Sequence, residues 1–167
     1  NKHLVITTYT YESEKLGADL DGYRIVQISD LHNAEFGKEN KKLLETIRSC
    51  SPDIIVITGD LVDSNHTNVE RAVAFVKEAV KIAPVYYVTG NHEYWLDPSE
   101  NEQMMQGILA AGACDLDDEV VRIEKGDSSF MLAGLDDQHL SDETLKNLLQ
   151  EQKNELSIVL AHEPQYL

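Results

Sequence analysis

Cysteine is scarce in this chain: the two cysteines, Cys50 and Cys114, lie far apart and lack Cys-x-x-Cys spacing. They supply neither a disulfide framework nor a zinc finger, and each is interpreted as an ordinary thiol. Long apolar runs are missing as well, since none approaches the ~20 residues that a bilayer-spanning helix needs. The chain also has no internal repeat, low-complexity tract or linker, so a single globular domain is expected.

Basic residues are few. Lys and Arg number 14 against 30 Asp and Glu, which gives a formal net charge of −16. This balance argues against a grip on a nucleic-acid phosphate backbone, which needs clustered Lys and Arg. It also predicts repulsion of polyanions unless bound cations reverse the local sign. The 167 residues and a hydrophobic content of 42% suffice for one domain with a real core.

The strongest local pattern lies between Asp53 and Asp63. Residues 54–58 are uncharged and β-prone, which fits a strand covered on both faces, as in a parallel sheet. Gly59 ends that run, and Asp60 stands where the chain leaves the sheet. Taken alone, this Gly-Asp pair is a common turn. However, ligands of open α/β sheets bind beyond the carboxyl ends of the strands, where a carboxylate can hold one or two cations.

Hydrophobic periodicity and turn signals divide the chain into strands and helices. Strands are predicted at residues 4–12, 24–29, 54–58, 85–89, 119–124, 128–133 and 157–161. Helices are predicted at about 38–49, at about 68–82, from Ser99 to Gly112, and from Ser141 onward. This order indicates an α/β layered architecture with some antiparallel sheet.

Two of these helices carry the capping-box spacing, Thr67 with Glu70 and Ser99 with Glu102. The later of the two is expected to turn four apolar side chains inward: Met104, Met105, Ile108 and Leu109.

Four of the predicted strands end in side chains that commonly bind metal ions: Asp30 with His32, Asp60, Asn91 with His92, and His162. Because parallel strands gather their carboxyl ends along one edge of a sheet, we expect these side chains to converge. Mixed carboxylate, imidazole and amide ligands suit manganese, iron or zinc better than calcium.

The segments around these residues resemble the motifs of the calcineurin-like metallophosphoesterases: Ser29–His32, Gly59–Asp63, Gly90–Glu93 and Ala161–Pro164. The resemblance covers essentially the whole chain, with the family's motif order and spacing. Residues 24–32 are most similar to a bacterial branch often found with an amino-terminal membrane anchor or export signal. The resemblance implies an α/β fold, a sandwich of two mixed β-sheets flanked by helices, and one catalytic domain over residues 1–167.

The resemblance also implies a metal-binding role for five matched residues. Asp30 and His32 would bind the first metal ion. Asp60 would bridge both ions, while Asn91 and His162 would bind the second. The cofactors would be two divalent ions of manganese, iron or zinc.

The implied activity is that of a dimetal phosphoesterase, in which a metal-activated water attacks a phosphate mono- or diester. His92 would protonate or stabilise the leaving oxygen, a role that imidazole commonly takes. The expected substrate is compact, such as a lipid- or nucleotide-linked phosphate. Localisation stays open between a cytoplasmic and a membrane-associated or exported bacterial protein, with membrane contact made by residues outside this chain.

One motif of that family is missing, since Gly-His-x-His does not occur anywhere in the chain. We therefore expect the domain to be incomplete at its C-terminal side, without its last strands and two histidine ligands. The alternative is a non-catalytic scaffold of the same fold with an incomplete metal site. A receiver-like domain with Asp60 as phosphoacceptor lacks the required Lys after the last strand. An aspartyl-nucleophile phosphatase lacks a second Asp two places after Asp30.

Several flanking residues have two interpretations. Asp63 either orients a ligand or caps the following segment, and Glu93 is similarly ambiguous. Tyr94 and Trp95 are interpreted as packing residues, with substrate or lipid contact as the alternative. Asp136-Asp137 resembles a loop that could line the substrate mouth. Three histidines outside the motifs are expected to be exposed: His3, His66 and His139.

Overall fold

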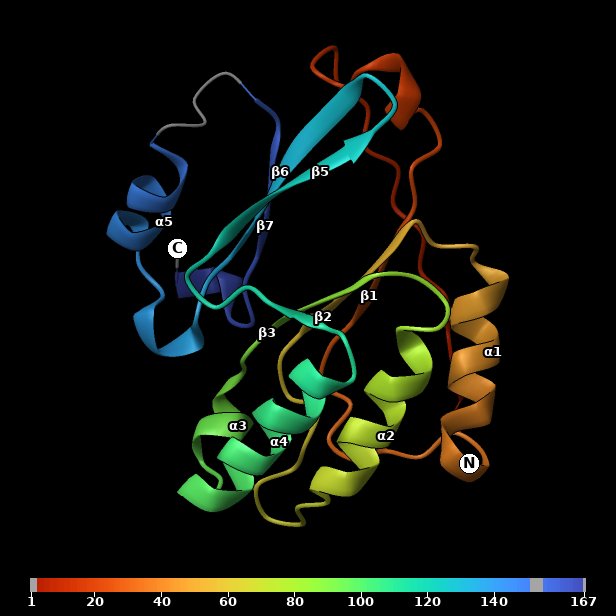
Figure 1. The fold of residues 1–167 in the computed structure, drawn as a ribbon, viewed down its shortest axis with the longest axis vertical. Helices are drawn as coiled ribbons and strands as arrows, with labels where there is room; N and C mark the ends of the chain where they lie inside the picture. Colours follow the sequence, from red (N-terminus) through yellow and green to blue (C-terminus); the bar gives the residue numbers. More distant parts are fainter. Residues whose placement is uncertain (1–2, 151–154, 167) are drawn as a thin grey trace.

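A computed structural model describes residues 3–150 and 155–166, which form a sandwich of two β-sheets (Figure 1). The first sheet holds four parallel strands in the order β1 (Ile25–Ile28), β2 (Ile54–Thr58), β3 (Val85–Val88) and β4 (Cys114–Asp115). The second holds β5 (Val120–Lys125), β6 (Ser128–Gly134) and β7 (Ser157–Leu160). In that sheet β5 pairs with β6 antiparallel and β6 pairs with β7 parallel.

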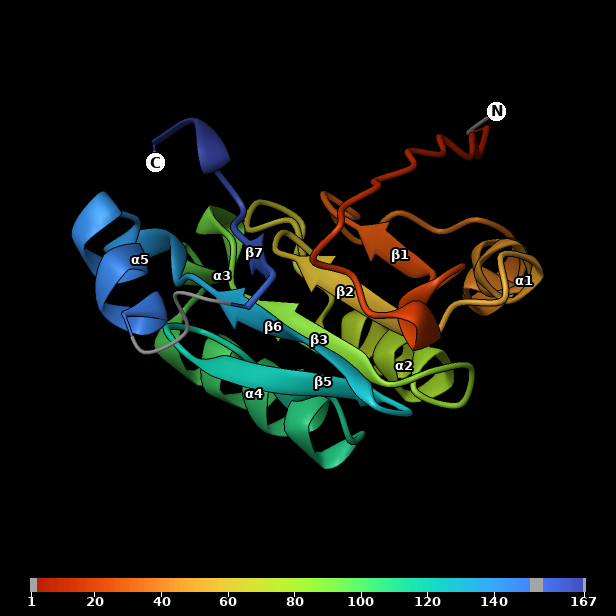
Figure 2. The same ribbon diagram turned by 90° about the horizontal axis from the view of Figure 1, so that it is seen from above.

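Helices flank the two sheets, as the view from above also shows (Figure 2). They are α1 (Lys41–Ser49), α2 (Val69–Ala79), α3 (Asn91–Tyr94), α4 (Pro98–Ala110) and α5 (Asp142–Leu149). Short 3-10 turns lie at Ala18–Leu20, Lys38–Asn40, Asp137–His139 and Pro164–Tyr166. The predicted α/β sandwich of two sheets flanked by helices is confirmed, although among the described strands only the second sheet is mixed and the first is parallel throughout. None of the helices in the described ranges is both long and apolar enough to cross a bilayer.

Strand β2 explains why residues 54–58 carry no charge, because all five are buried. Ile55 and Ile57 belong to a core that the first sheet shares with α1, α2 and α4. Ile54 and Val56 belong to a second core between the two sheets. Alternate side chains of one strand therefore fill opposite cores, which is the two-sided burial expected of a central parallel strand.

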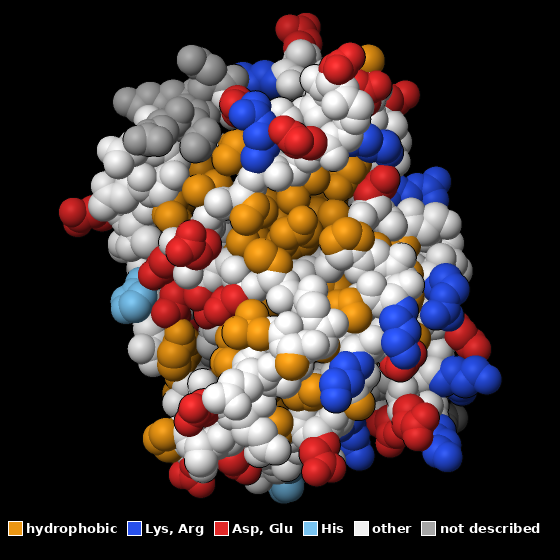
Figure 3. All heavy atoms as spheres, in the orientation of Figure 1, with side chains coloured by type: hydrophobic (Ala, Val, Ile, Leu, Met, Phe, Trp, Pro, Cys, Tyr) orange, Lys and Arg blue, Asp and Glu red, His pale blue; other side chains and the backbone are white. Residues whose placement is uncertain are grey.

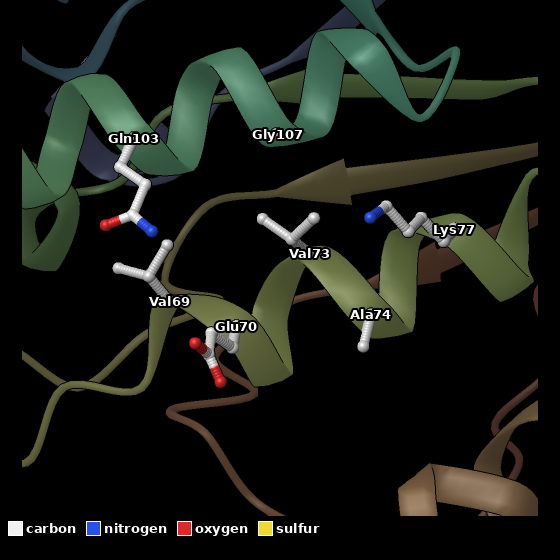
Figure 4. A pocket seen from close by; sticks show the side chains of 7 residues that line it. All are labelled: Val69, Glu70, Val73, Ala74, Lys77, Gln103 and Gly107. Carbon is white, nitrogen blue, oxygen red and sulfur yellow. The ribbon is translucent and has the colours of Figure 1, made fainter.

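In the helix layer on the first sheet, a cleft lies between α2 and α4. Figure 4 shows the side chains that line it: Val69, Glu70, Val73, Ala74, Lys77, Gln103 and Gly107. A Cβ on Gly107 would lie 3.0 Å from Cγ1 of Val73, so the glycine permits the close approach of the two helices. None of the predicted metal ligands lines this cleft, so it is not a candidate site for phosphate chemistry.

A second groove runs between the segment at residues 8–25 and the second sheet. Its apolar lining comes from Leu16, Tyr23, Phe130, Leu156 and Ile158. Figure 3 shows hydrophobic side chains gathered in the upper middle of one face of the molecule, with charged side chains around them.

Both predicted capping boxes are wrong. Asn68, not Thr67, caps α2 by accepting the Arg71 N–H at 2.9 Å, because the Thr67 hydroxyl donates to the carbonyl of Asp63 instead. Helix α4 begins at Pro98, whose fixed φ suits the first helical position. Within that helix, Met104 and Ile108 are buried and Met105 is partly buried, as predicted. Leu109, however, is 49% exposed.

The strand predicted at residues 4–12 is also wrong. This segment has no regular secondary structure, and Val5 and Tyr9 are largely exposed. β-Branched and aromatic residues favour a strand only where a neighbouring strand and a core receive them. Here no strand lies alongside in the part of the chain that the structure describes, and only Leu4 packs against the core.

Candidate metal centre

The carboxyl ends of β1, β2 and β3 lie side by side, because these strands are parallel and in register. Asp30 and Asp60 each come two residues after a strand, and both are left-handed, with φ of 54° and 55°. His32 is left-handed as well, with φ of 46°. Asp and His tolerate this region better than most residues, and such strain clusters at functional sites. The His32 N–H donates to the carbonyl of Asp60 at 2.9 Å, which joins the two loops.

Two glycines allow the β2 and β3 loops to touch. A Cβ on Gly59 would lie 2.6 Å from the Gly90 Cα and 2.8 Å from Nδ1 of His162. A Cβ on Gly90 would lie 2.7 Å from the backbone nitrogen of Asp60. Real Cβ atoms do not approach other atoms so closely, so a side chain at either glycine would separate the β2 loop from the β3 loop, and one at Gly59 would also displace His162.

Asp60 lies at the centre of the site and is 2% exposed. Its Oδ2 is 3.5 Å from Nε2 of His32 and 3.4 Å from Nε2 of His162. Its Oδ1 accepts the backbone N–H of His92 at 2.9 Å. One carboxylate oxygen thus faces two imidazoles while the other is held by the β3 loop. This burial also argues against the receiver-like alternative, which needs Asp60 open to a phosphodonor.

His162 comes from the second sheet and reaches into the first. Its Nδ1 contacts the carbonyl oxygen of Thr58 at 2.9 Å, and because a carbonyl only accepts, Nδ1 carries the proton. Its Nε2 faces Oδ1 of Asn91 at 2.9 Å as well as Asp60. This arrangement leaves Nε2 as the nitrogen that could bind a metal ion, with the ring oriented by a carbonyl on its other side.

Asp30 completes the set, with a carboxylate that lies near Asp60 and His162 as well as near His32. Its Oδ1 is 3.7 Å from Nε2 of His32, and its Oδ2 accepts the Ser29 hydroxyl. Asp30 is more exposed than Asp60. The five residues predicted as ligands therefore come together at one edge of the sheet.

Asp60 and His162 shift each other's pKa values. Hydrogen bonding with Asp60 raises the pKa of His162 to about 9, against the opposing effect of burial. Burial disfavours the Asp60 carboxylate, but hydrogen bonds from His162 and from the His92 N–H outweigh it and lower the pKa of Asp60.

The spacing of the donor atoms fits divalent ions. The side chains form two groups that share Asp60, each with donor atoms within 4.8 Å of one another: His32, Asp60 and His92, and Asp30, Asp60 and His162. Two ligands that each lie ~2.1 Å from one ion are roughly 3.0–3.5 Å apart. The distances from Asp60 to the two histidine ligands fall in this range. These residues could therefore hold two ions with Asp60 between them.

His92 is oriented differently from the other two site histidines. Its Nδ1 accepts the backbone N–H of Ser64 at 3.1 Å, so Nε2 carries the proton in the neutral ring. Oδ1 of Asp63 lies 3.8 Å from Nδ1 of His92. The His92 ring also packs against those of His32 and Trp95, with centroid distances of 4.5 and 4.9 Å. The Ser64 N–H and the contact with the His32 ring hold a proton-bearing nitrogen beside the ligand cluster.

Glu93 has a structural role that its sequence context leaves ambiguous. It is fully buried and accepts three backbone N–H groups: those of Asp60 at 2.8 Å, Gly90 at 2.9 Å and Val62 at 3.3 Å. Burial raises the pKa of Glu93 to about 7, although the three N–H donors favour its ionised form. Glu93 therefore braces the β2 loop against the β3 loop beneath the site.

Asn33 is a second support that the sequence pattern does not reveal. Its Oδ1 accepts the N–H groups of Asp63 at 3.2 Å and Asn68 at 2.9 Å, and its Nδ2 donates to the Asn68 carbonyl at 2.9 Å. Asp63 itself accepts the N–H of Asn65, as a turn-capping residue does, which lowers the pKa of Asp63. Asn33 thus fixes the β1 loop to the segment that leads into α2.

The remaining flanking residues divide between exposed and structural positions. The His139 side chain is 62% exposed and pairs with Asp118 at 2.8 Å and Asp136 at 3.3 Å. Tyr94 is half-buried and its hydroxyl donates to Asp136, so its packing interpretation is correct. Trp95 is 64% exposed, so its packing interpretation is wrong. The other two histidines, His3 and His66, are exposed, as predicted.

Comparisons with known proteins agree with this fold. Residues 23–166 match the family model described as calcineurin-like phosphoesterase. The chain is 27% identical over 143 residues to the metallophosphoesterase YkoQ of Bacillus subtilis, covering 84% of this chain and 53% of YkoQ. It is 37% identical over 94 residues to the UDP-2,3-diacylglucosamine pyrophosphatase LpxG of Chlamydia trachomatis, covering 54% of this chain and 29% of LpxG.

A solved structure, TT1561 of Thermus thermophilus, shares the fold with a TM-score of 0.57 at 14% identity. The match covers 82% of this chain and 66% of that one. The chain spans about half the length of YkoQ. The extent of the catalytic domain and the roles of the individual site residues stay predictions.

Proposed function

This chain belongs to the calcineurin-like phosphoesterase family, and on that premise we propose that it hydrolyses a phosphate mono- or diester with the help of two divalent metal ions. The observation that carries this proposal is the position of Asp60. Its buried Oδ2 lies between the Nε2 atoms of His32 and His162, 3.5 and 3.4 Å away. A carboxylate placed in this way can serve two adjacent cations at once.

The other ligands would divide around Asp60. Asp30 and His32 would hold one ion, and Asn91 and His162 the other. Two divalent ions would lower the pKa of an attacking water and offset the negative charge of the phosphoryl oxygens. Asn91 supplies an oxygen without adding negative charge, which keeps the site attractive to phosphate. The mixed oxygen and nitrogen donors favour manganese, iron or zinc.

His92 would act on the leaving group. The Ser64 N–H occupies Nδ1, so the proton on Nε2 is the one available for donation. The contact between the His92 and His32 rings, 4.5 Å between centroids, keeps this proton next to the ligand cluster. Protonation of the departing oxygen by His92 would complete the cleavage of the P–O bond.

The proposal extends to a compact substrate such as a lipid- or nucleotide-linked phosphate. LpxG, to which 54% of the chain aligns, is named for a pyrophosphatase acting on a diacylated nucleotide sugar. The excess of acidic side chains, with a net charge of −16, disfavours a nucleic-acid backbone as substrate.

The test is metal-dependent hydrolysis by the purified protein. After chelation and reloading with Mn²⁺, Zn²⁺ or Fe²⁺, we expect about two bound ions per chain and hydrolysis of para-nitrophenyl phosphate or bis(para-nitrophenyl) phosphate. Asp60→Asn should remove both ions and the activity. Asp127→Asn, at an exposed turn, is the matched control. Hydrolysis that persists in Asp60→Asn or in excess chelator would overturn the proposal.

A non-catalytic scaffold is the second candidate, because the five predicted ligands leave few protein donors for each of two ions. The same experiment separates the two functions. Metal binding that Asp60→Asn abolishes, without hydrolysis of either ester by the wild type, would favour the scaffold.

A further inference from the structure

Trp95 is the only tryptophan of the chain, and it is 64% exposed. This exposure is unusual, because tryptophan normally buries most of its large apolar surface. The backbone around it is well anchored. The Trp95 N–H donates to the carbonyl of Asn91 at 3.2 Å, and the N–H of Leu96 donates to the carbonyl of Glu93 at 3.3 Å. Since Leu96 and Glu93 are buried, the exposed indole stands on a rigid support.

The indole contacts the residue proposed to protonate the leaving group. The Trp95 and His92 ring centroids are 4.9 Å apart, and the two planes are tilted by 50°. The His92 ring in turn meets that of His32, which belongs to the ligand cluster, at 4.5 Å. Three aromatic rings therefore lead from the candidate metal centre to an exposed apolar surface.

We propose that Trp95 is a specificity-determining residue that binds an apolar group on the leaving side of the phosphate ester. The inference rests on the proposed function, because it uses His92 as the proton donor. An oxygen that receives its proton from His92 must depart on the His92 side of the phosphorus. The substituent that this oxygen carries then lies next to the His92 ring, where the indole offers the adjoining apolar surface.

The acidic side chains near His92 and Tyr94 indicate what kind of leaving group this part of the site could bind. Oδ1 of Asp63 lies 3.8 Å from Nδ1 of His92. Asp97 is close to Trp95 in the sequence, and the Tyr94 hydroxyl donates a hydrogen bond to the Asp136 carboxylate. A leaving group that carries further phosphates or carboxylates would be repelled by the carboxylate beside the His92 ring and by the net charge of −16. An uncharged aromatic ring or an acyl chain would not, and either could cover the exposed indole. The assigned class is thus a phosphate ester with an uncharged apolar leaving group.

Leaving-group dependence tests this assignment. Phenyl, hexyl and methyl phosphate are compared by phosphate release, using the ratio of kcat/KM in Trp95→Ala to that in the wild type, so that intrinsic reactivity cancels. We expect a loss of about 10–100-fold for phenyl or hexyl phosphate, the range that one aromatic stacking contact supports. Methyl phosphate should change less than about 2-fold, because it has no apolar group to contact the indole.

The outcomes of this comparison separate recognition from support of His92. A loss with phenyl phosphate alone assigns an aromatic leaving group, and a loss with hexyl phosphate as well assigns any apolar group. An equal loss for all three esters means that Trp95 merely positions His92. No loss for any ester means that Trp95 has no role in recognition. Either result overturns the proposal. Trp95→Phe should restore most of the phenyl phosphate activity, and Leu109→Ala, which removes another exposed apolar side chain, should change nothing.

Fluorescence gives a readout that does not depend on turnover, because Trp95 is the sole tryptophan. In the zinc-loaded protein, phenylphosphonate should change the emission and protect it from acrylamide quenching, whereas methylphosphonate should not. If hydrolysis is metal-dependent and neither measurement involves Trp95, this inference fails and the proposed function stands. If the protein hydrolyses no ester but phenylphosphonate still protects Trp95, the proposed function fails and the apolar binding surface stands.

Discussion

The two sheets differ in how completely they are covered. In the first sheet every residue of β2 is buried, and β3 has three buried residues of four. In the second sheet only the central strand β6 is comparably buried, at six residues of seven, while β5 has a single buried residue and residues 157–159 of β7 are only partly buried. No residue of α5, all of which the structure describes, is fully buried. The first sheet thus has cores on both faces, while the second is packed closely on one face only.

The candidate site follows the same division. Four of the five predicted ligands come from the loops of the first sheet: Asp30, His32, Asp60 and Asn91. His162 alone comes from the second sheet, where it follows β7. Buried side chains and parallel hydrogen bonding therefore preorganise one part of the site. The other part depends on the docking of the second sheet, which brings His162 to Thr58.

The largest loss of stability is expected on the first-sheet side, from Glu93→Ala. The change leaves three buried N–H groups without an acceptor, those of Asp60, Val62 and Gly90. Because each unpaired group costs about 1–3 kcal/mol, we expect a loss of about 4 kcal/mol in unfolding free energy and a Tm lower by roughly 10 °C. Thermal unfolding in chelator measures this without a metal contribution.

Glu102→Ala is the matched control for Glu93→Ala. Glu102 is an exposed glutamate on α4 whose carboxylate accepts a hydrogen bond from Gln106. Its replacement should change the unfolding free energy by less than about 0.5 kcal/mol. Equal effects of the two variants would show that the buried brace does not stabilise the first-sheet loops.

The next largest effect separates the two sides directly. In His162→Ala the donors from the first sheet stay in place, so we expect one bound ion per chain instead of about two. The affinity for the ion that His162 is proposed to bind should fall by at least about 100-fold. His32→Ala should remove the other ion. Elemental analysis after dialysis against a metal buffer counts the ions. His66→Ala, whose side chain is 89% exposed, should leave both in place. Two ions retained in His162→Ala would contradict the division.

The same division explains how much could be predicted from the sequence. The strand at 54–58 and the polar residues that follow β1, β2, β3 and β7 were predictable, because two-sided burial demands an uncharged run and parallel strands end at one edge. The local sequence pattern does not predict the structure where contacts with distant parts of the chain determine it. Residues 4–12 have strand-like composition but no neighbouring strand, and the exposure of Trp95 depends on what the fold leaves uncovered.

The supports beneath the site were not predictable for a related reason. The hydrogen bonds of Glu93 and of Asn33 link separate loops, and each side chain satisfies backbone groups about 30 residues away along the chain. No periodicity or spacing encodes such a partnership. The motif around His92 includes Glu93, which is the single signal that could have suggested its importance.

Asn33→Ala should have an intermediate effect, again on the first-sheet side. It removes the acceptor of the Asp63 and Asn68 N–H groups and the donor to the Asn68 carbonyl. Because Asn33 is 8% exposed and has a φ of 53°, which alanine adopts less readily, we expect a loss of about 2 kcal/mol. Urea unfolding measures it. Asn65→Ala, an exposed change in the neighbouring loop, should cost less than about 0.5 kcal/mol, and a similar loss in both variants would count against this role.

The smallest effect concerns the connection between the sheets, where Asp117 lies between β4 and β5. Its Oδ1 accepts the Thr89 N–H at 2.8 Å, and burial raises its pKa from 3.8 to about 6. The folded protein therefore binds this proton more tightly than the unfolded chain. The resulting stabilisation is fully present below about pH 4 and is lost as the pH rises through about 6.

Asp117→Asn should abolish that contribution to the pH dependence. Relative to the wild type, the variant should gain on the order of 1 kcal/mol in unfolding free energy as the pH rises from about 4 to about 7, because only the wild type must then ionise a largely buried carboxyl group. Urea unfolding at several pH values measures the difference between the two proteins. Asp127→Asn, at the exposed β5–β6 turn, should follow the wild-type curve. If Asp117→Asn follows it too, the connection between the sheets is not sensitive to this charge, and the pH response of stability must come from the metal centre or the second sheet.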